Sequence, residues 1–260
     1  MTEEFRFIFK GYGIIFGDIP TFIFLSCPEF PFIMGKIQTI LFDLDDTLFP
    51  YAGHYQIEAD DAVFALVEGK FVRRDYLEVK MHMDTEYYCG RMGHDTYFDR
   101  KARYALLLER IGVLERIGMR GEDLAEQMDQ KFQSALSGVR PYSDVLITLE
   151  ALFATFSLGI VTNGLHKYQD KKREALGIAS FISLYLCSQD VGCAKPSPLF
   201  FSRAIALSGD SPEEILVVGN DLEGDIIPAR AAGMQGMLIM REGPPREGVI
   251  SALDQLLSIL

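Results

Sequence analysis

Short apolar runs with strand character recur along the chain and alternate with stretches of helical pattern. There are five such runs, namely Thr39–Phe42, Phe156–Val161, Leu184–Cys187, Ile215–Val218 and Met237–Met240. The helical segments after the second, third and fourth runs close near Gly177, Gly209 and Gly233, and a glycine suits the end of a helix. This alternation predicts an α/β fold in which a parallel sheet is flanked by helices on both faces.

The interval between the first two runs, about 110 residues, is much longer than one crossover helix requires. Its clearest pattern is an apolar stripe of helical spacing, formed by Leu124, Met128, Phe132 and Leu136. Further helical stretches are Ile57–Val67, Tyr76–Tyr88 and a segment that closes at Gly112. We therefore expect residues 51–137 to form an inserted all-helical cap, and residues 36–50 and 138–260 to form the core.

The first 35 residues differ in character from the rest. They are rich in Phe and Ile, but charges and prolines interrupt them, so no uncharged run reaches the roughly 18 residues that a membrane span needs. A secretory signal is not expected either, because Glu3 and Glu4 stand where a basic region belongs. We interpret residues 1–35 as an N-terminal extension, with a native start at Met34 as one explanation.

The formal net charge of −12 comes without any long basic stretch, so the chain is not expected to bind nucleic acid. A small anionic substrate remains compatible with this charge, because the field inside a pocket can oppose the net charge. The four cysteines form no CxxC pair, which favours reduced thiols in a cytoplasmic protein. No membrane association is expected, and the sequence leaves both a monomer and a homodimer open.

The strongest chemical signal follows the first apolar run, in Asp43-Leu44-Asp45-Asp46-Thr47. Side chains at the carboxyl end of a parallel strand point into the crevice where open α/β sheets bind ligands. Three acids this close repel one another unless a cation neutralises them, and oxygen ligands suit Mg²⁺. A solvated turn capped by Asp and Thr is the alternative interpretation.

Polar residues also follow three later runs. Thr162, Asn163 and Gly164 come after the second run and could offer a hydroxyl and backbone N–H groups to an anion. Lys195 lies just ahead of two prolines, Pro196 and Pro198, which restrict the backbone there. The fourth run ends in Gly219-Asn220-Asp221, with Asp225 four residues on; a helix start with an acidic first turn is the alternative there.

In their order, these four segments resemble the four motifs of the haloacid dehalogenase-like (HAD) superfamily, in the branch with a helical cap inserted after the first strand. The resemblance covers residues from Gly35 to Met240. It implies a Rossmann-like core with the first strand at its centre, and a cap that closes over the site and helps to select the substrate.

The resemblance also implies a role for each matching residue. Asp43 is expected to be the nucleophile that forms an aspartyl-phosphate, and Asp45 the general acid and then the base. Lys195 is expected to offset negative charge on Asp43 and the phosphoryl group. The implied substrate-binding residues are Thr47, Thr162, Asn163, Gly164 and Lys195. Mg²⁺ is expected on Asp43, the main-chain carbonyl of Asp45 and an acid of the fourth segment.

The fourth segment departs from the family pattern, which usually places Asp directly after Gly. A gapless alignment puts the neutral Asn220 in the metal position, whereas a shift of one residue uses Asp221. We favour Asp221, with Asp225 close by in either register. If Asn220 is the ligand, weaker metal binding is expected.

The sequence thus predicts a Mg²⁺-dependent phosphatase that acts on a small phosphorylated metabolite. A dehalogenase of this superfamily lacks the second acid of the first motif, so Asp45 argues against that activity. A phosphomutase uses both acids and stays open, and a non-catalytic binding module is a further alternative. Cap residues that could face the substrate are His54, Tyr55, Arg91, His94, Arg100 and Arg103.

Overall fold

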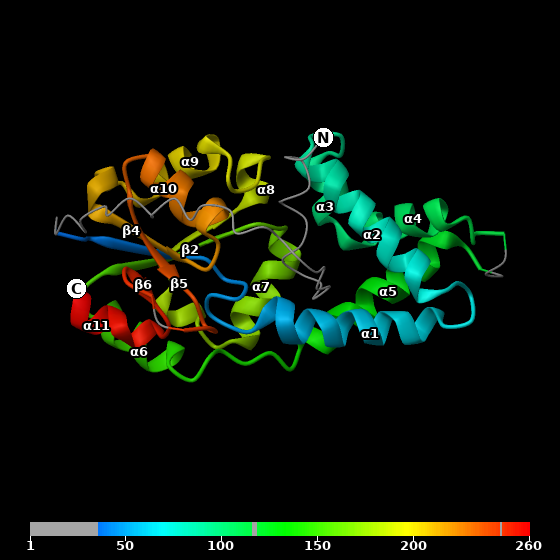
Figure 1. Ribbon diagram of the computed structural model, residues 1–260, viewed down its shortest axis with the longest axis horizontal. Helices are drawn as coiled ribbons and strands as arrows, with labels where there is room; N and C mark the ends of the chain where they lie inside the picture. The colour runs from blue at the N-terminus through cyan, green and yellow to red at the C-terminus, as the bar shows by residue number, and fades with distance from the viewer. Residues whose placement is uncertain (1–35, 116–118, 245) are drawn as a thin grey trace.

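A parallel sheet of six strands forms the centre of the described chain, which comprises residues 36–115, 119–244 and 246–260 of a computed structural model (Figure 1). The spatial order is β3-β2-β1-β4-β5-β6. The strands are β1 (Thr39–Phe42), β2 (Ser157–Thr162), β3 (Leu184–Cys187), β4 (Ile215–Gly219), β5 (Gln235–Ile239) and β6 (Val249–Ile250). The predicted Rossmann-like fold class is confirmed. The two-residue β6 was not predicted, because so short a strand leaves no apolar run. The expected extension over residues 1–35 lies outside the described residues.

Strand β1 lies between β2 and β4 and pairs with both, so that Phe42 is opposite Ile160 on one side and Val218 on the other. Its side chains are buried on both faces of the sheet. Ile40 and Phe42 belong to one apolar cluster, and Leu41 belongs to the other. A strand covered on both faces reads as a continuous apolar run, which is why β1 could be recognised in the sequence.

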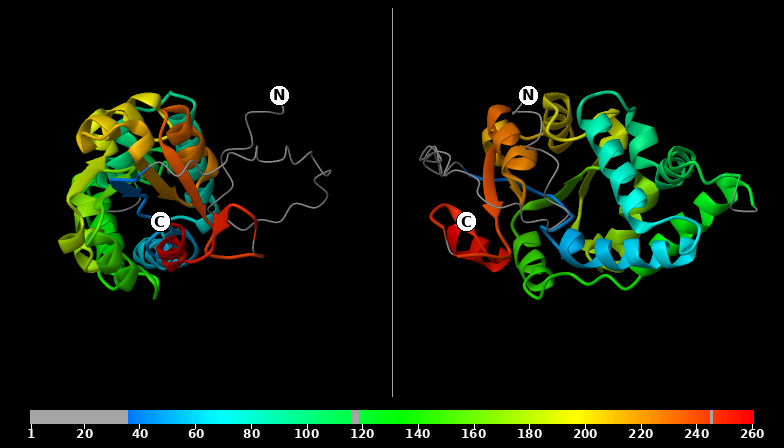
Figure 2. Two further views of the ribbon diagram at one scale, coloured as in Figure 1. Left: turned by 90° about the vertical axis from the view of Figure 1, so that its left-hand side faces the viewer. Right: turned by 45° about the vertical axis from the view of Figure 1, so that its right-hand side comes forward.

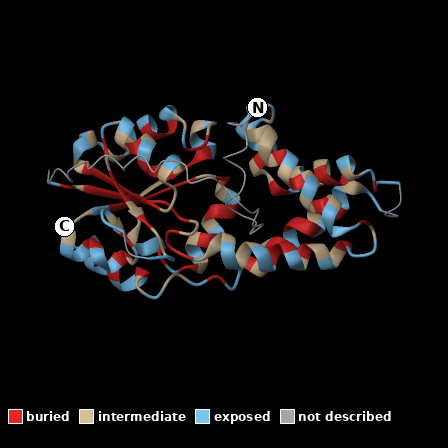
Figure 3. Ribbon diagram, viewed as in Figure 1, coloured by how far each residue is buried: buried red, intermediate tan, exposed pale blue. Residues whose placement is uncertain are grey.

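Helices cover both faces of this sheet (Figures 1 and 3). Above it in Figure 1 lie α8 (Ser188–Val191), α9 (Pro198–Ser208) and α10 (Ile227–Ala231), and below it lie α6 (Val145–Phe153), α7 (His166–Ala175) and α11 (Leu256–Ile259). Single-turn helices complete the connections: η2 (Ala179–Phe181), η3 (Pro212–Glu214), η4 (Leu222–Ile226) and η5 (Leu253–Gln255). Within the described ranges, no helix combines the length and apolar character needed to cross a bilayer.

The inserted segment between β1 and α6 is helical and lies beyond the carboxyl ends of the strands (Figure 2). It contains η1 (Tyr51–Tyr55), α1 (Gln56–Val67), α2 (Arg73–Tyr88), α3 (His94–Phe98), α4 (Arg100–Ile111) and α5 (Gly121–Leu136). The apolar stripe of α5 is buried, and α5 packs against α1 and α4. The structure thus has the inserted helical cap that the fold-class prediction includes.

Two ion pairs are buried among the described residues of the cap. The Lys80 Nζ lies 2.5 Å from the Asp60 carboxylate, which also accepts a hydrogen bond from the Tyr76 hydroxyl. Arg100 pairs with Asp129 at 3.4 Å. Buried charges require such partners, since an unpaired charge in a low-dielectric interior is strongly destabilising.

Candidate active site

A cavity of ≈ 740 Å³ lies at the carboxyl ends of the strands, where the core meets the start of the cap. Residues of all four predicted segments line it, together with two tyrosines of the cap: Asp43, Asp45, Thr162, Asn163, Lys195, Asn220, Asp221, Asp225, Tyr51 and Tyr88. Parallel strands end at the same edge of a sheet, so segments far apart in the sequence meet there. None of the six cap residues suggested by the sequence is in this lining.

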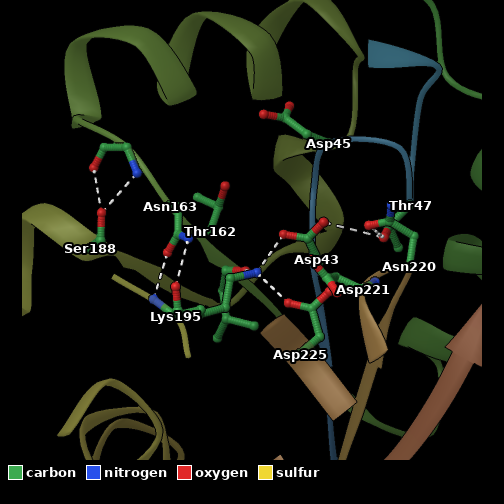
Figure 4. A network of polar contacts seen from close by, with 12 residues as sticks. Asp43, Asp45, Thr47, Thr162, Asn163, Ser188, Lys195, Asn220, Asp221 and Asp225 are labelled. Atoms are coloured by element: carbon green, nitrogen blue, oxygen red, sulfur yellow. Dashed lines mark hydrogen bonds and ion pairs between the residues drawn. The ribbon is translucent and has the colours of Figure 1, made fainter. Parts of the chain in front are cut away.

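Asp43, Lys195 and Asp225 form a buried charged cluster at the base of the cavity (Figure 4). The Lys195 Nζ donates to Asp43 Oδ1 at 2.6 Å, to Asp225 Oδ1 at 2.7 Å and to the Val161 carbonyl at 3.0 Å. Asp43 also donates its main-chain N–H to the Val218 carbonyl. The acid expected to be the nucleophile is therefore fixed to the central strands and held against a cation.

Burial in this cluster raises the pKa of Asp43 to about 7. Lys195 opposes this shift, and the carboxylates of Asp225 and Asp45 add to it. For Lys195, burial works to lower the pKa, but the carboxylates of Asp225 and Asp43 outweigh burial and raise it. With both acids ionised, the cluster of Asp43, Asp225 and Lys195 carries a net negative charge.

Thr47 lies between the first and fourth segments. Its hydroxyl is 3.3 Å from Asp43 Oδ2 and 3.3 Å from Asn220 Oδ1. The Thr47 carbonyl accepts two hydrogen bonds from the guanidinium of Arg241, which in turn pairs with Asp144 at 2.6 Å. Arg241 follows β5, so it links the first-segment loop to the end of β5 and to Asp144 before α6. Sequence reasoning missed this role.

The second segment is held in place by side chains of α7 and α8. The Thr162 hydroxyl accepts a hydrogen bond from Gln169, and the Gly164 N–H donates to the Ser188 hydroxyl at 2.8 Å. Gly164 has a φ of 142°, and a Cβ there would lie 2.9 Å from the Gln169 amide. The Asn163 side chain contacts the main chain of Lys195 in both directions, at 2.8 and 3.2 Å. Asn163 therefore orients the predicted lysine.

In the fourth segment, Asp225 packs directly against the end of β4. A Cβ on Gly219 would lie 2.3 Å from Asp225 Oδ2, so only glycine fits at this position. Asp221 donates its N–H to Asp225 Oδ2 at 3.1 Å, and its carboxylate accepts the Glu223 N–H at the start of η4. The predicted N-cap is thus present, and both Asn220 and Asp221 also line the cavity.

The three neighbouring acids of the first segment have three separate partners. Asp43 pairs with Lys195, while the Asp46 carboxylate accepts the N–H groups of Tyr51 and Ala52 at the start of the cap. The Asp45 carboxylate binds the Nζ of Lys172, at 2.7 and 2.8 Å. Sequence reasoning missed Lys172. The signal for it was the helical spacing of Gln169, Lys172 and Leu176, which places the lysine on the buried face of α7.

The donor set suits Mg²⁺. This ion usually binds one or two carboxylates, keeps several waters and also uses substrate phosphates, so it does not require a cage of protein side chains. The described residues contain no cluster of three or more His, Cys, Asp or Glu side chains arranged to hold a metal. The net negative charge at Asp43 and the carboxylate of Asp221 fit a divalent cation, while both oxygens of Asp225 already accept hydrogen bonds, from Lys195 and from the Asp221 N–H.

Comparison with known proteins agrees with this arrangement. The model of the haloacid dehalogenase-like hydrolase family matches residues 37–233. The glyceraldehyde 3-phosphate phosphatase of Methanopyrus kandleri is 33% identical over 208 residues, 79% of this chain and 84% of that protein. The phosphoserine phosphatase of Thermus thermophilus is 28% identical over 229 residues, 81% and 92% of the two chains. The structure of the HAD-hydrolase YfnB of Bacillus subtilis aligns with a TM-score of 0.66, at 21% identity, over 86% and 99% of the two chains.

Proposed function

The chain belongs to the haloacid dehalogenase-like hydrolase family, and from this premise we propose that it is a Mg²⁺-dependent phosphatase of small phosphomonoesters. The observation that carries the proposal is the contact of Asp43 with Lys195 at 2.6 Å, at the base of a cavity that Asp45 also lines. It supports an assignment in which Asp43 is the nucleophile, Lys195 a fixed cation and Asp45 the second acid. Relatives named as phosphatases support the same chemistry.

In the first step, an oxygen of the Asp43 carboxylate attacks the phosphorus, and the bond from phosphorus to the leaving oxygen breaks. The carboxyl group of Asp45 gives its proton to that oxygen, and the alcohol departs. In the second step, the Asp45 carboxylate takes a proton from water, and the resulting hydroxide attacks the phosphorus. The bond to Asp43 then breaks, which releases phosphate and restores both acids.

Fixed charges reduce the electrostatic cost of bringing phosphate to a carboxylate. Lys195 is held in place by Asp43, Asp225 and the Val161 carbonyl, so no reorganisation is needed when charge develops on the phosphoryl group. Thr162 supplies a hydroxyl at the end of β2, and Thr47 supplies another beside Asp43. We assign substrate binding to these residues and to the main chain at Asn163 and Gly164.

The residues that would hold Mg²⁺ are Asp43, the main-chain carbonyl of Asp45, and Asp221. Asp221 is chosen over Asn220 because it is the charged member of the pair that follows β4, and Asp225 braces it through its main-chain N–H. When bound, the cation neutralises the repulsion between the nucleophile and the phosphate.

Hydrolysis of p-nitrophenyl phosphate tests the proposal, with and without Mg²⁺, followed by a panel of sugar phosphates, nucleotides and phosphorylated acids. Asp43→Asn keeps the shape of the site and removes the nucleophile, and we expect it to abolish turnover. The matched control is Asp61→Asn, which changes an exposed cap acid paired with Arg73. Turnover that survives Asp43→Asn, or that is absent from the wild type, contradicts the proposal. Accumulation of an isomeric phosphate ester in place of free phosphate would identify a mutase.

A further inference from the structure

The carboxylate of Asp45 is held by a lysine that belongs to none of the four segments. Lys172 Nζ contacts both oxygens, Oδ1 at 2.8 Å and Oδ2 at 2.7 Å. The lysine side chain is 3% exposed, compared with 26% for Asp45. An exposed lysine loses side-chain entropy when it forms such a pair, so the pair adds little to stability. A buried lysine already has a restricted side chain, so its ammonium group is held in place. Lys172 can therefore fix the direction of the Asp45 carboxylate.

Helix α7 presents Lys172 to the site together with Gln169. The two residues are three apart, so their side chains lie on one face of the helix. Gln169 donates to the Thr162 hydroxyl at 3.0 Å, and Lys172 donates to Asp45. One face of α7 thus sets the positions of two catalytic side chains, one that follows β1 and one that ends β2.

The Lys172 ammonium also contacts the first residue of the cap. It lies 3.9 Å from the ring centroid of Tyr51 and 5.8 Å from that of Phe49. A cation over an aromatic face is attracted by the ring, more strongly where water is excluded. Tyr51 lines the catalytic cavity and begins η1. The ammonium is therefore enclosed by the acid, by α7 and by the start of the cap.

Asp45 points away from the cluster of Asp43, Lys195 and Asp225 (Figure 4). The two lysines thus divide the acids, with Lys195 on the nucleophile and Lys172 on the second acid. The divided arrangement keeps Asp45 at the wall of the cavity.

We propose that Lys172 is a positioning residue, which keeps the Asp45 side chain at the wall of the cavity, where Asp45 meets the leaving oxygen of the substrate. This inference rests on the proposed function, because it takes Asp45 as the general acid. Geometry of this kind matters for catalysis, since a small displacement of an acid from the atom it protonates lowers the rate steeply. Lys172 itself touches no reacting atom.

The test compares phenyl phosphate with p-nitrophenyl phosphate, which are similar in shape but differ in leaving group. Phenolate is strongly basic and needs a proton as it departs, whereas p-nitrophenolate does not. The measured quantity is kcat/KM, which covers all steps through departure of the leaving group. We expect Lys172→Met to lower kcat/KM about 30-fold for phenyl phosphate and less than about 3-fold for p-nitrophenyl phosphate. Lys172→Arg, which keeps the cation, should recover most of the loss.

The control is Lys171→Met, which changes the adjacent lysine of α7, an exposed residue that contacts Gln133 of the cap. It should leave both substrates unaffected. In an Asp45→Asn background, Lys172→Met should lower phenyl phosphate hydrolysis by less than about 2-fold further, since nothing remains to be positioned. Equal losses on both substrates, a gain on phenyl phosphate, or additive losses in the double variant would overturn the inference. Absence of Asp43-dependent turnover in the wild type would instead contradict the proposed function.

Discussion

Two aspartates that line the cavity of ≈ 740 Å³, Asp43 and Asp45, each pair with a buried lysine, but the two lysines are anchored differently. Lys195 receives its partners from the sheet: Asp43 after β1, the Val161 carbonyl within β2, and Asp225 after β4. Lys172 reaches Asp45 from a helix and lies over Tyr51, where the cap begins. Asp43 thus belongs to the centre of the sheet, while Asp45 lies at the junction with the cap.

In the proposed function, this difference gives Asp43 and Asp45 separate roles. A nucleophile serves every substrate in the same way, and a fixed position on the central strands suits it. An acid must meet a leaving group whose size and basicity depend on the substrate. In the proposed function, the acid is Asp45, whose partner Lys172 lies against Tyr51 at the start of the cap.

The largest effect is expected from removing Lys195, which should slow the hydrolysis of both esters, unlike the removal of Lys172. We expect Lys195→Met to lower kcat/KM about 10³-fold on phenyl and p-nitrophenyl phosphate alike, because Lys195 stabilises charge that develops with any leaving group. Steady-state kinetics of both esters measure this. Lys195→Arg is the matched variant, and its cation in a differently shaped head should recover only part of the rate. A loss that depends on the leaving group would contradict the assignment.

The buried ion pair of Lys80 and Asp60 lies away from the cavity, so its loss should affect stability alone. Lys80→Met leaves Asp60 as an uncompensated buried charge, so we expect a loss of about 3–5 kcal/mol in the free energy of unfolding. Urea denaturation measures it. The exposed pair of Arg73 and Asp61 is the control, and Arg73→Met should cost about 0–1 kcal/mol. Folded Lys80→Met should keep the wild-type ratio of phenyl to p-nitrophenyl phosphate hydrolysis, unlike Lys172→Met.

Mg²⁺ affinity distinguishes Asp221 from Asn220 as the ligand of the proposed metal site. We expect Asp221→Asn to weaken Mg²⁺ about 10- to 100-fold in titrations of activity and of thermal shift, because it removes an ionised oxygen ligand. Asn220→Asp should change the affinity much less. Tighter binding in Asn220→Asp, with no effect of Asp221→Asn, would assign the metal to Asn220.

The raised pKa of Asp43 predicts the smallest effect, on stability without metal. A carboxyl group with a folded-state pKa of about 7, against 3.8 in an unfolded chain, holds its proton more tightly in the folded protein. Its contribution is fully present below about pH 4 and is lost as the pH rises through 7. Asp43→Asn does not titrate, and Lys195 keeps Asp225 as a partner. Metal-free Asp43→Asn should therefore exceed the wild type by about 1–2 kcal/mol at pH 8 and by less at pH 5. Thermal unfolding at the two pH values measures the difference.

Much of the fold and the composition of the cavity could be predicted because both are encoded locally. Strands covered on two faces read as apolar runs, and polar residues directly after them reach one edge of the sheet. In this way Asp43 and Thr162 could be placed at one edge from the sequence, while Lys195, which follows α8 rather than a strand, was added by the resemblance to the family motifs. The helical stripe of the cap was equally local, since its spacing is set by one turn of helix.

The remaining features depend on the angles between elements, which a local pattern does not contain. Lys172 stands in a run with Lys171 and Arg173 that reads as a solvated charged surface. Helical spacing marks it as the buried member, but a local pattern does not show that it reaches Asp45. Tyr51 and Tyr88 line the cavity because of how the cap sits on the core. By contrast, Arg100, suggested as a substrate contact, pairs with Asp129 and lines a separate cavity of ≈ 340 Å³. His94 contacts Ser188 of the core.

The central position of β1 has a consequence for local opening of the protein. The Asp43 N–H is hydrogen-bonded to the Val218 carbonyl, in a strand paired on both sides. In native-state hydrogen exchange, amides of such strands exchange only through the largest openings, whereas exposed helical tips exchange through small ones. The cap can thus fray and re-form many times while the Asp43 amide stays protected from deuterium. We therefore expect the amide of Asp43 to be among the last to exchange.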